Sequence, residues 1–186
     1  LEAILRADDA DRPRALFTSS VLQNPTGSSM TAQNAYRVLQ LAEQHGLWIV
    51  EDDLHRELAD PAAPMLAALD GLRRTLYVSG FSKTISPSLR AGYVVADAAI
   101  TRELARTKMA VALTSSEITE RIVHAFVTRP VYAEHVARLI ARLGEAHTRV
   151  EALMRQHGAE PFDTPGRGLF LWARLPGQTD ASALAN

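Results

Sequence analysis

The chain of 186 residues has no cysteine, few aromatic residues (6%) and almost no lysine. The missing cysteines exclude disulfide bonds, zinc–thiolate sites and a cysteine nucleophile. Because 18 of the basic residues are arginines, only Lys83 and Lys108 offer a side-chain amine. No apolar run approaches the roughly 18 residues that span a membrane, and the first residues do not resemble a secretory signal. We therefore expect a cytoplasmic protein without a membrane segment.

The sequence also lacks a strong charge of either sign. Its formal net charge is −1, which supplies no field for nucleic-acid phosphates, so we expect no DNA or RNA binding by these residues themselves. No pair of histidines has a spacing typical of metal ligands, and we expect no metal site. The contents of hydrophobic (47%) and charged (22%) residues are those of a globular domain.

The first half of the chain alternates between strand and helix patterns. A run of β-forming residues at 15–22 is closed by a turn sequence, Asn24-Pro25-Thr26-Gly27. Helical spacing follows from a cap at Thr31 to Gly46, and buried strands are predicted at 47–50 and 75–78. This alternation predicts an α/β fold with parallel strand pairs.

The second half of the chain is mostly helical. A strand at 92–96 follows 75–78 without a crossover helix, so we expect it to run antiparallel to its neighbour. An apolar stripe over 136–154 predicts one long helix, which ends at Gly158 and is followed by a strand at 168–175. We expect residues 1–130 to form part of a large α/β domain, and 131–186 to form a linking helix and the start of a small domain.

Three of the predicted strands are followed by polar groups. Asn24 follows the first, the pair Asp52 and Asp53 follows the second, and Lys83 follows the third. The carboxyl ends of parallel strands share one edge of a sheet, where ligands of open α/β sheets bind. A lysine held at such an edge can form a Schiff base with a carbonyl compound.

The amino-acid sequence of these segments resembles that of the fold-type I, pyridoxal-phosphate-dependent aminotransferases. Within that superfamily it looks most like the aminotransferase-like domain of MocR-type regulators of the GntR family. The resemblance implies a central, mostly parallel sheet with one antiparallel strand and the start of a small α+β C-terminal domain, the chain being a fragment. The segments that carry it are Asn24-Pro25-Thr26-Gly27, Glu51-Asp52-Asp53, Ser79-Gly80-Phe81-Ser82-Lys83-Thr84, Pro87 to Tyr93 and Pro165 to Trp172.

The resemblance also implies a role for each site residue. Lys83 would hold pyridoxal 5'-phosphate as a Schiff base and, in an enzyme, move the proton between substrate and cofactor. Asp52 would pair with the pyridine nitrogen and Asn24 would bind the phenolate oxygen. Arg90 would bind the phosphate through two hydrogen bonds, with Ser82 donating its hydroxyl.

The sequence departs from this family pattern at two positions. His55 stands where many relatives have a tyrosine, and its imidazole can donate to the same phenolate oxygen. Alternatively, His55 points into its loop and packs near Leu58. Gly80 stands where relatives often have a phosphate-binding serine, so one phosphate contact is expected to be lost.

Two functions remain open at this stage. The chain is either the effector-sensing domain of a MocR/GntR-type transcription regulator or part of a free-standing aminotransferase acting on amino and 2-keto acids. The wording of the motifs favours the regulator. The resemblance implies a homodimer and an amino acid, amine or vitamer as ligand. It also implies that DNA is bound only through an N-terminal domain that is not present in this chain.

Overall fold

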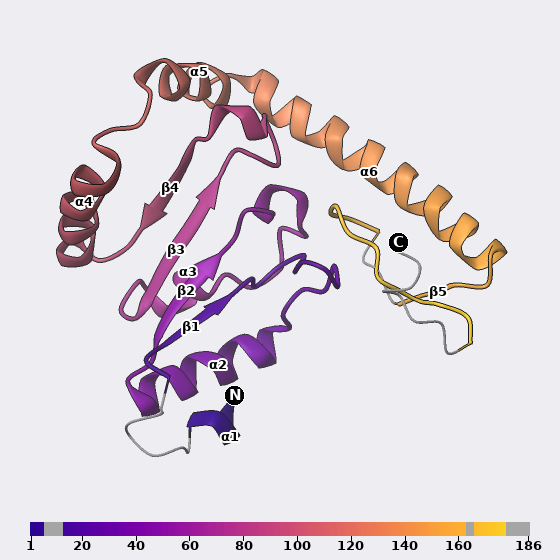
Figure 1. The fold of residues 1–186 in the computed structure, drawn as a ribbon, viewed down its shortest axis with the longest axis horizontal. Coiled ribbons are helices and arrows are strands. Elements are labelled where there is room, and N and C mark those ends of the chain that lie inside the picture. Colours follow the sequence, from indigo (N-terminus) through magenta and orange to yellow (C-terminus); the bar gives the residue numbers. More distant parts are fainter. Residues whose placement is uncertain (6–12, 163–165, 178–186) are drawn as a thin grey trace.

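The centre of the computed structural model, which describes residues 1–5, 13–162 and 166–177, is a four-stranded sheet (Figure 1). Its strands lie in the order β1-β2-β3-β4, and β1, β2 and β3 run parallel while β4 runs antiparallel to β3. The mostly parallel sheet with one antiparallel strand is therefore confirmed. The strands are β1 (Ala15–Thr18), β2 (Trp48–Asp52), β3 (Thr75–Gly80) and β4 (Gly92–Val95).

Helix α2 (Ala32–His45) covers one face of the sheet and has the predicted ends. The Thr31 hydroxyl accepts a hydrogen bond from the backbone N–H of Asn34, and Gly46 takes the left-handed conformation (φ 64°) that ends the helix. The apolar side of α2 packs against β2, α1 (Glu2–Leu5) and α3 (Leu66–Asp70). The buried residues of this core are Leu5, Ala35, Leu41, Ala42, Leu47, Ile49 and Leu66.

Glu51 of β2 faces the same side of the sheet and is fully buried (0% exposed). Its two carboxylate oxygens accept hydrogen bonds of 2.8 Å from the backbone N–H groups of Leu66 and Ala67. These are donors of the first turn of α3, which have no partner inside the helix. Glu51 is therefore a buried cap that joins α3 to the centre of the sheet.

Three helices follow the sheet, and the last is the long helix that the sequence predicts. They are α4 (Ala98–Ala112), α5 (Glu117–Val127) and α6 (Pro130–Gln156). Three apolar residues of α6 pack against a second buried cluster, which comes from the loops that follow β1 and β2. Figure 1 shows α6 lying beyond the carboxyl ends of the parallel strands. The packed residues are Leu139, Ile140 and Leu143 on α6, with Val21, Leu22, Leu58 and Ala59 in the cluster.

Two strand predictions were wrong in their extent. The strand expected at 15–22 ends at Thr18, because the Ser20 carbonyl accepts a hydrogen bond from the backbone N–H of Met30 (2.7 Å). Of the strand expected at 168–175, β6 (Ala173–Arg174) is the part that forms a strand within the described residues, paired with β5 (Glu160–Pro161), and the Trp172 carbonyl accepts a further hydrogen bond from the backbone N–H of Phe162 (2.8 Å). The strand does not begin at Gly168, because the backbone there is left-handed (φ 85°) and its carbonyl bonds to His147 of α6.

None of the helices in the described part of the chain is long and apolar enough to cross a membrane. The division of the chain near residue 130 into a large domain and a linking helix stays a prediction. Helix α6 starts at Pro130, since proline favours the first turn of a helix.

Candidate functional site

The carboxyl ends of β1, β2 and β3 bring the polar groups singled out above to one edge of the sheet. Asn24 lies in the turn that follows β1, Asp52 is the last residue of β2, and Lys83 comes three residues after the end of β3. The three strands are parallel neighbours, so the segments that leave them begin side by side. Figure 1 shows this edge facing α6.

The two adjacent aspartates at the end of β2 have different environments. Asp53 is buried (1% exposed), and its carboxylate forms a 2.6 Å ion pair with the Nε of Arg56. Burial raises the pKa of Asp53, although the neighbouring guanidinium acts in the opposite direction. Asp52 is exposed, and within the described residues its carboxylate accepts a single long hydrogen bond, from the backbone N–H of Leu54 (3.3 Å). Of the pair, Asp52 is therefore the carboxylate that can bind a ligand.

His55 is another buried polar side chain of this edge (9% exposed). Within the described part of the chain its Nε2 has no hydrogen-bond partner, and its ring packs edge-on against Phe170 (5.5 Å between centroids). Burial lowers the pKa of His55, and the positive charge of Lys83 lowers it further while Asp52 raises it. Lys83 and Asp52 thus both lie close enough to His55 to affect its charge.

Lys83 and Ser82 lie in a tight turn over 81–86, and both are half-buried. The Phe81 carbonyl accepts hydrogen bonds from the backbone N–H groups of Ile85 (2.8 Å) and Ser86 (3.2 Å). Among the residues that the structure describes, the amine of Lys83 has no ion-pair or hydrogen-bond partner. The turn therefore presents an amine that is available for a reaction.

Arg90 ends the short 3₁₀ helix η2 (Pro87–Leu89), in the segment between the lysine turn and β4. Its backbone is left-handed (φ 50°) and its side chain is exposed. It forms no ion pair with any residue in the described ranges. An unpaired guanidinium can bind a phosphate or carboxylate through two parallel hydrogen bonds.

Gly80, which stands in place of the serine expected from relatives, is required by close packing of the backbone. A Cβ at this position would lie 3.0 Å from the carbonyl oxygen of Ala91 and 3.3 Å from the side chain of Leu54. A side chain at Gly92, its partner in β4, would meet the Ser79 carbonyl at 2.9 Å. The close approach of β3 and β4 therefore leaves little room for a serine side chain at position 80.

The segment 166–172 covers the turn that contains Asn24. Gly27 of that turn has a left-handed backbone (φ 69°), and a Cβ there would lie 3.2 Å from the carbonyl oxygen of Phe170. Arg167 donates a hydrogen bond to the Ala59 carbonyl (3.2 Å), just after the 3₁₀ helix η1 (Arg56–Leu58). These contacts place Phe170 against both the turn and His55.

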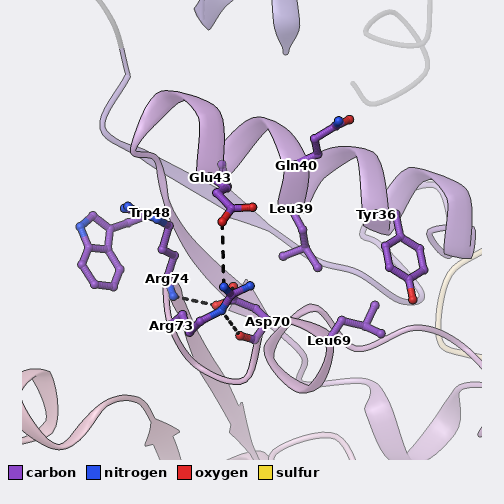
Figure 2. A pocket seen from close by; sticks show the side chains of 10 residues that line it. Tyr36, Leu39, Gln40, Glu43, Trp48, Leu69, Asp70, Arg73 and Arg74 are labelled. Atoms are coloured by element: carbon purple, nitrogen blue, oxygen red, sulfur yellow. Dashed lines mark hydrogen bonds and ion pairs between the residues drawn. The ribbon is translucent and has the colours of Figure 1, made fainter.

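A hollow of about 610 Å³ lies at the opposite edge of the sheet, where β2 and β3 begin (Figure 2). Three of its charged residues, Asp70, Arg73 and Glu43, already interact with neighbours in the hollow. Asp70 accepts hydrogen bonds from the backbone N–H of Arg74 (2.6 Å) and, through its carbonyl, from the Nε of Arg73 (3.0 Å), while Arg73 also approaches Glu43 (3.9 Å). The hollow has none of the groups of the lysine edge, so we do not assign the chemistry to it.

Sequence reasoning missed the contributions of Arg56 and Phe170 to this site. Arg56 holds Asp53 and thereby separates the roles of the two aspartates, and the only local signal for it is its spacing of three residues from Asp53. Phe170 was expected in a strand, and no local pattern indicates that it packs on His55.

Comparisons with known proteins agree with this arrangement. The profile of the family "Aminotransferase class I and II" matches residues 1–186. The HTH-type transcriptional regulator NorG of Staphylococcus aureus is 28% identical over 163 residues, which are 86% of this chain and 37% of the regulator. The 2-aminoadipate transaminase of Thermus thermophilus is 30% identical over 191 residues, which are 99% of this chain and 48% of that enzyme. The chain thus spans less than half the length of these relatives.

Solved structures show the same fold. The alpha-aminoadipate aminotransferase of Thermus thermophilus, solved with N-(5'-phosphopyridoxyl)-L-leucine, is 27% identical with a TM-score of 0.83, covering 98% of this chain and 48% of that one. A kynurenine aminotransferase of Pyrococcus horikoshii is 23% identical with a TM-score of 0.82, covering 94% of this chain and 44% of that one. The sheet is therefore that of a fold-type I aminotransferase, and the chain belongs to the class I and II aminotransferase family.

Proposed function

We propose that this aminotransferase-like domain binds pyridoxal 5'-phosphate, with Lys83 as the point of attachment, and that it senses an effector for a transcription regulator of the MocR/GntR type. One observation carries the cofactor proposal. The buried Nε2 of His55, which has no hydrogen-bond partner among the described residues, lies near both Lys83 and Asp52, at the carboxyl edge of parallel strands.

The groups at this edge complement the polar groups of the cofactor one by one. The amine of Lys83 suits the aldehyde, and the exposed carboxylate of Asp52 suits the pyridine N–H. The guanidinium of Arg90, with the Ser82 hydroxyl, suits the phosphate. The Nε2 of His55, without a partner in the part of the chain that the structure describes, suits the phenolate oxygen, and Asn24 in the turn after β1 suits the same oxygen.

Each residue then has a defined task. When bound, pyridoxal phosphate supplies an electron sink for bonds to the carbon of an amino group. Lys83 would hold the cofactor through its Nζ, and the same nitrogen would take up and return a proton. Asp52 would pair with the ring nitrogen through a charge-assisted hydrogen bond. Phe170 and the buried side of His55 exclude water from this part of the edge.

The names of the relatives support the sensing role. NorG and the Bacillus subtilis protein YdfD, 30% identical over 170 residues, are both named as HTH-type transcriptional regulators, and this chain matches 37% and 35% of their lengths. We infer that the protein binds DNA through a separate N-terminal domain, works as a homodimer in the cytoplasm, and takes an amino acid, an amine or a vitamer as effector.

A spectroscopic titration with pyridoxal phosphate tests the cofactor site in the protein that carries this chain. We expect saturable binding with a red-shifted absorbance, and weaker binding after Asp52→Asn, because the ring nitrogen loses its counter-charge. Asp60→Asn, an exposed aspartate in the loop after η1, is the matched control and should bind as the unchanged protein does. Equal affinity of the Asp52 and Asp60 variants would remove Asp52 from the site.

A free-standing aminotransferase is the second candidate, favoured by the 30% identity to the 2-aminoadipate transaminase. The two functions differ in turnover. Incubation with 2-aminoadipate and 2-oxoglutarate, followed by analysis of the keto acids, should show no multiple turnover if the domain is a sensor. An effector should then change DNA binding by the whole protein. Sustained keto-acid production without any effect on DNA binding would favour the enzyme.

A further inference from the structure

Two side chains from the first two turns of α6 hold Thr84, the residue that follows Lys83. The Tyr132 hydroxyl donates a hydrogen bond to the hydroxyl oxygen of Thr84 (3.1 Å). The Nε2–H of His135 donates to the Thr84 carbonyl (2.7 Å). Thr84 is buried (3% exposed), so its hydroxyl and its carbonyl depend on these partners rather than on water.

Packing fixes the two donor side chains. Tyr132 and His135 are three residues apart in α6 and therefore share one face of the helix. The ring of Phe126, at the end of α5, packs edge-on against both, with centroid distances of 6.4 Å to Tyr132 and 6.0 Å to His135. Each donor is therefore aimed at Thr84 by an aromatic neighbour as well as by its own helix.

The contact with Thr84 acts on the direction of Lys83. Consecutive Cα atoms are about 3.8 Å apart, so a residue pinned through its side chain and its carbonyl leaves its neighbour little freedom. The remainder of the turn is held by the two hydrogen bonds to the Phe81 carbonyl. Among the described residues, no hydrogen bond or ion pair holds the side chain of Lys83 itself, so its direction depends on the backbone of the turn.

We propose that Tyr132 and His135 are positioning residues for Lys83, which hold Thr84 and thereby set the direction in which the amine leaves its turn. The inference rests on the proposed role of Lys83 as the point of cofactor attachment. Its physical basis is that a misdirected nucleophile reacts more slowly even when its chemistry is unchanged. Because the donors lie in the helix that links to the C-terminal segment, α6 and the lysine turn are directly joined.

Hydrogen exchange in the protein without cofactor is the first test. Tyr132→Phe removes one hydroxyl and His135→Leu removes the second donor, whereas His135→Gln keeps an N–H donor and should restore the contact in part. The loss of one hydrogen bond predicts about 2- to 10-fold faster exchange of the amides at 84–86. Exchange in β3 should stay unchanged. Tyr36→Phe, which removes the hydroxyl of an exposed tyrosine on α2, is the matched control.

Borohydride trapping with pyridoxal phosphate is the second test. The rate at which label accumulates on Lys83 should fall about 2- to 10-fold in Tyr132→Phe and His135→Leu, and recover in His135→Gln. Tyr36→Phe should match the unchanged protein. These rates depend on the approach of the amine and not on turnover, so they apply equally to a sensor and to an enzyme.

The outcomes separate this inference from the proposed function. Absence of label on Lys83 in the unchanged protein would refute the cofactor site and, with it, the positioning role. Normal labelling of the unchanged protein, with exchange and labelling rates in Tyr132→Phe equal to those in Tyr36→Phe, would overturn the positioning role alone. Faster exchange across all strands in Tyr132→Phe would also overturn it, because the contact would then support the fold in general. Tyr132→Phe keeps the aromatic packing and decides the question if the His135 variants do not fold.

Discussion

Replacing Arg56 with methionine tests how the edge of the sheet keeps its two aspartates apart. Arg56 pairs with the buried Asp53 and donates hydrogen bonds of 3.0 Å to the carbonyls of Ala63 and Pro64. Its side chain is 16% exposed, and that of Asp53 is 0% exposed. Methionine fills a similar volume without a charge, so Asp53 is left buried without its counter-ion.

The magnitude follows from this burial. Removing one partner of a buried ion pair costs about 3–5 kcal/mol, because the other charge stays desolvated. We expect a loss of free energy of unfolding in that range at pH 7, measured by urea denaturation. Arg37→Met is the matched control, since its 2.6 Å ion pair with Glu2 joins side chains that are 51% and 43% exposed. Exposed pairs contribute about 0–1 kcal/mol, and the control should lose no more than that.

The destabilisation caused by Arg56→Met should depend on pH, because Asp53 titrates. The pKa of Asp53 is raised above its ordinary value of 3.8, so the unfolded state ionises first as the pH rises. The contribution of the protonated Asp53 side chain to the free energy of unfolding is complete below pH 3.8. It is lost as the pH rises through the pKa of Asp53 in the folded state. Removing Arg56 raises this pKa further. The difference between Arg56→Met and the unchanged protein should therefore shrink toward acid pH, to roughly 1–3 kcal/mol from the lost hydrogen bonds.

A double variant completes the experiment. Adding Asp53→Asn to Arg56→Met removes the stranded charge, and the double variant should be more stable at pH 7 than Arg56→Met alone. A loss below about 1 kcal/mol, as for an exposed pair, would refute the reasoning. So would a loss that does not change with pH, because the charge of Asp53 would then have no part in it.

Three further predictions concern the same region. The pKa of His55 is lowered from its ordinary value of 6.5, so the free energy of unfolding should increase as the pH rises from the lowered pKa to 6.5. Urea titrations at several pH values should show that His55→Phe lacks this increase. Glu51→Gln should lose about 2–3 kcal/mol of unfolding free energy, because the NH2 of the amide is a donor and would replace one of the two oxygens that accept from the backbone N–H groups of α3. Glu43→Gln, at an exposed side chain of α2, should lose almost nothing. Gly27→Ala should lower the free energy of unfolding more than Gly46→Ala in the same assay. Both positions have left-handed backbones, which cost about 1–2 kcal/mol for alanine, but a Cβ at position 27 would also lie against the carbonyl oxygen of Phe170.

Local patterns were sufficient to predict the main elements. The cap at Thr31, the glycine at 46 and the apolar run that became β2 depend on residues within a turn or two, and the structure has them where the sequence places them. The antiparallel direction of β4 followed from the short connection after β3. The parallel strands β1, β2 and β3, which Asn24, Asp52 and Lys83 follow in the sequence, were predicted from the alternation of strand and helix patterns, and the structure has them side by side.

Contacts between distant residues could not be predicted in this way. β1 ends at Thr18 because a backbone hydrogen bond between Ser20 and Met30 replaces the ladder. Thr84 is held by side chains 48 and 51 residues further along the chain, and His55 is buried by Phe170. The sequence left open whether His55 faces a ligand or packs in its loop. In the structure its Nε2 has no partner among residues 1–5, 13–162 and 166–177, and its contact with a cofactor stays a prediction.

Borohydride reduction of the protein that carries this chain, in the presence of pyridoxal phosphate and followed by peptide mapping, tests the central claim most directly. The chain has just two lysines, and Lys108 lies exposed on α4, where it donates to the Ser115 hydroxyl. We predict that the pyridoxyl group is found on Lys83 and that Lys83→Ala abolishes the label while Lys108→Ala retains it. A label on Lys108, or no label on either lysine, would contradict the account.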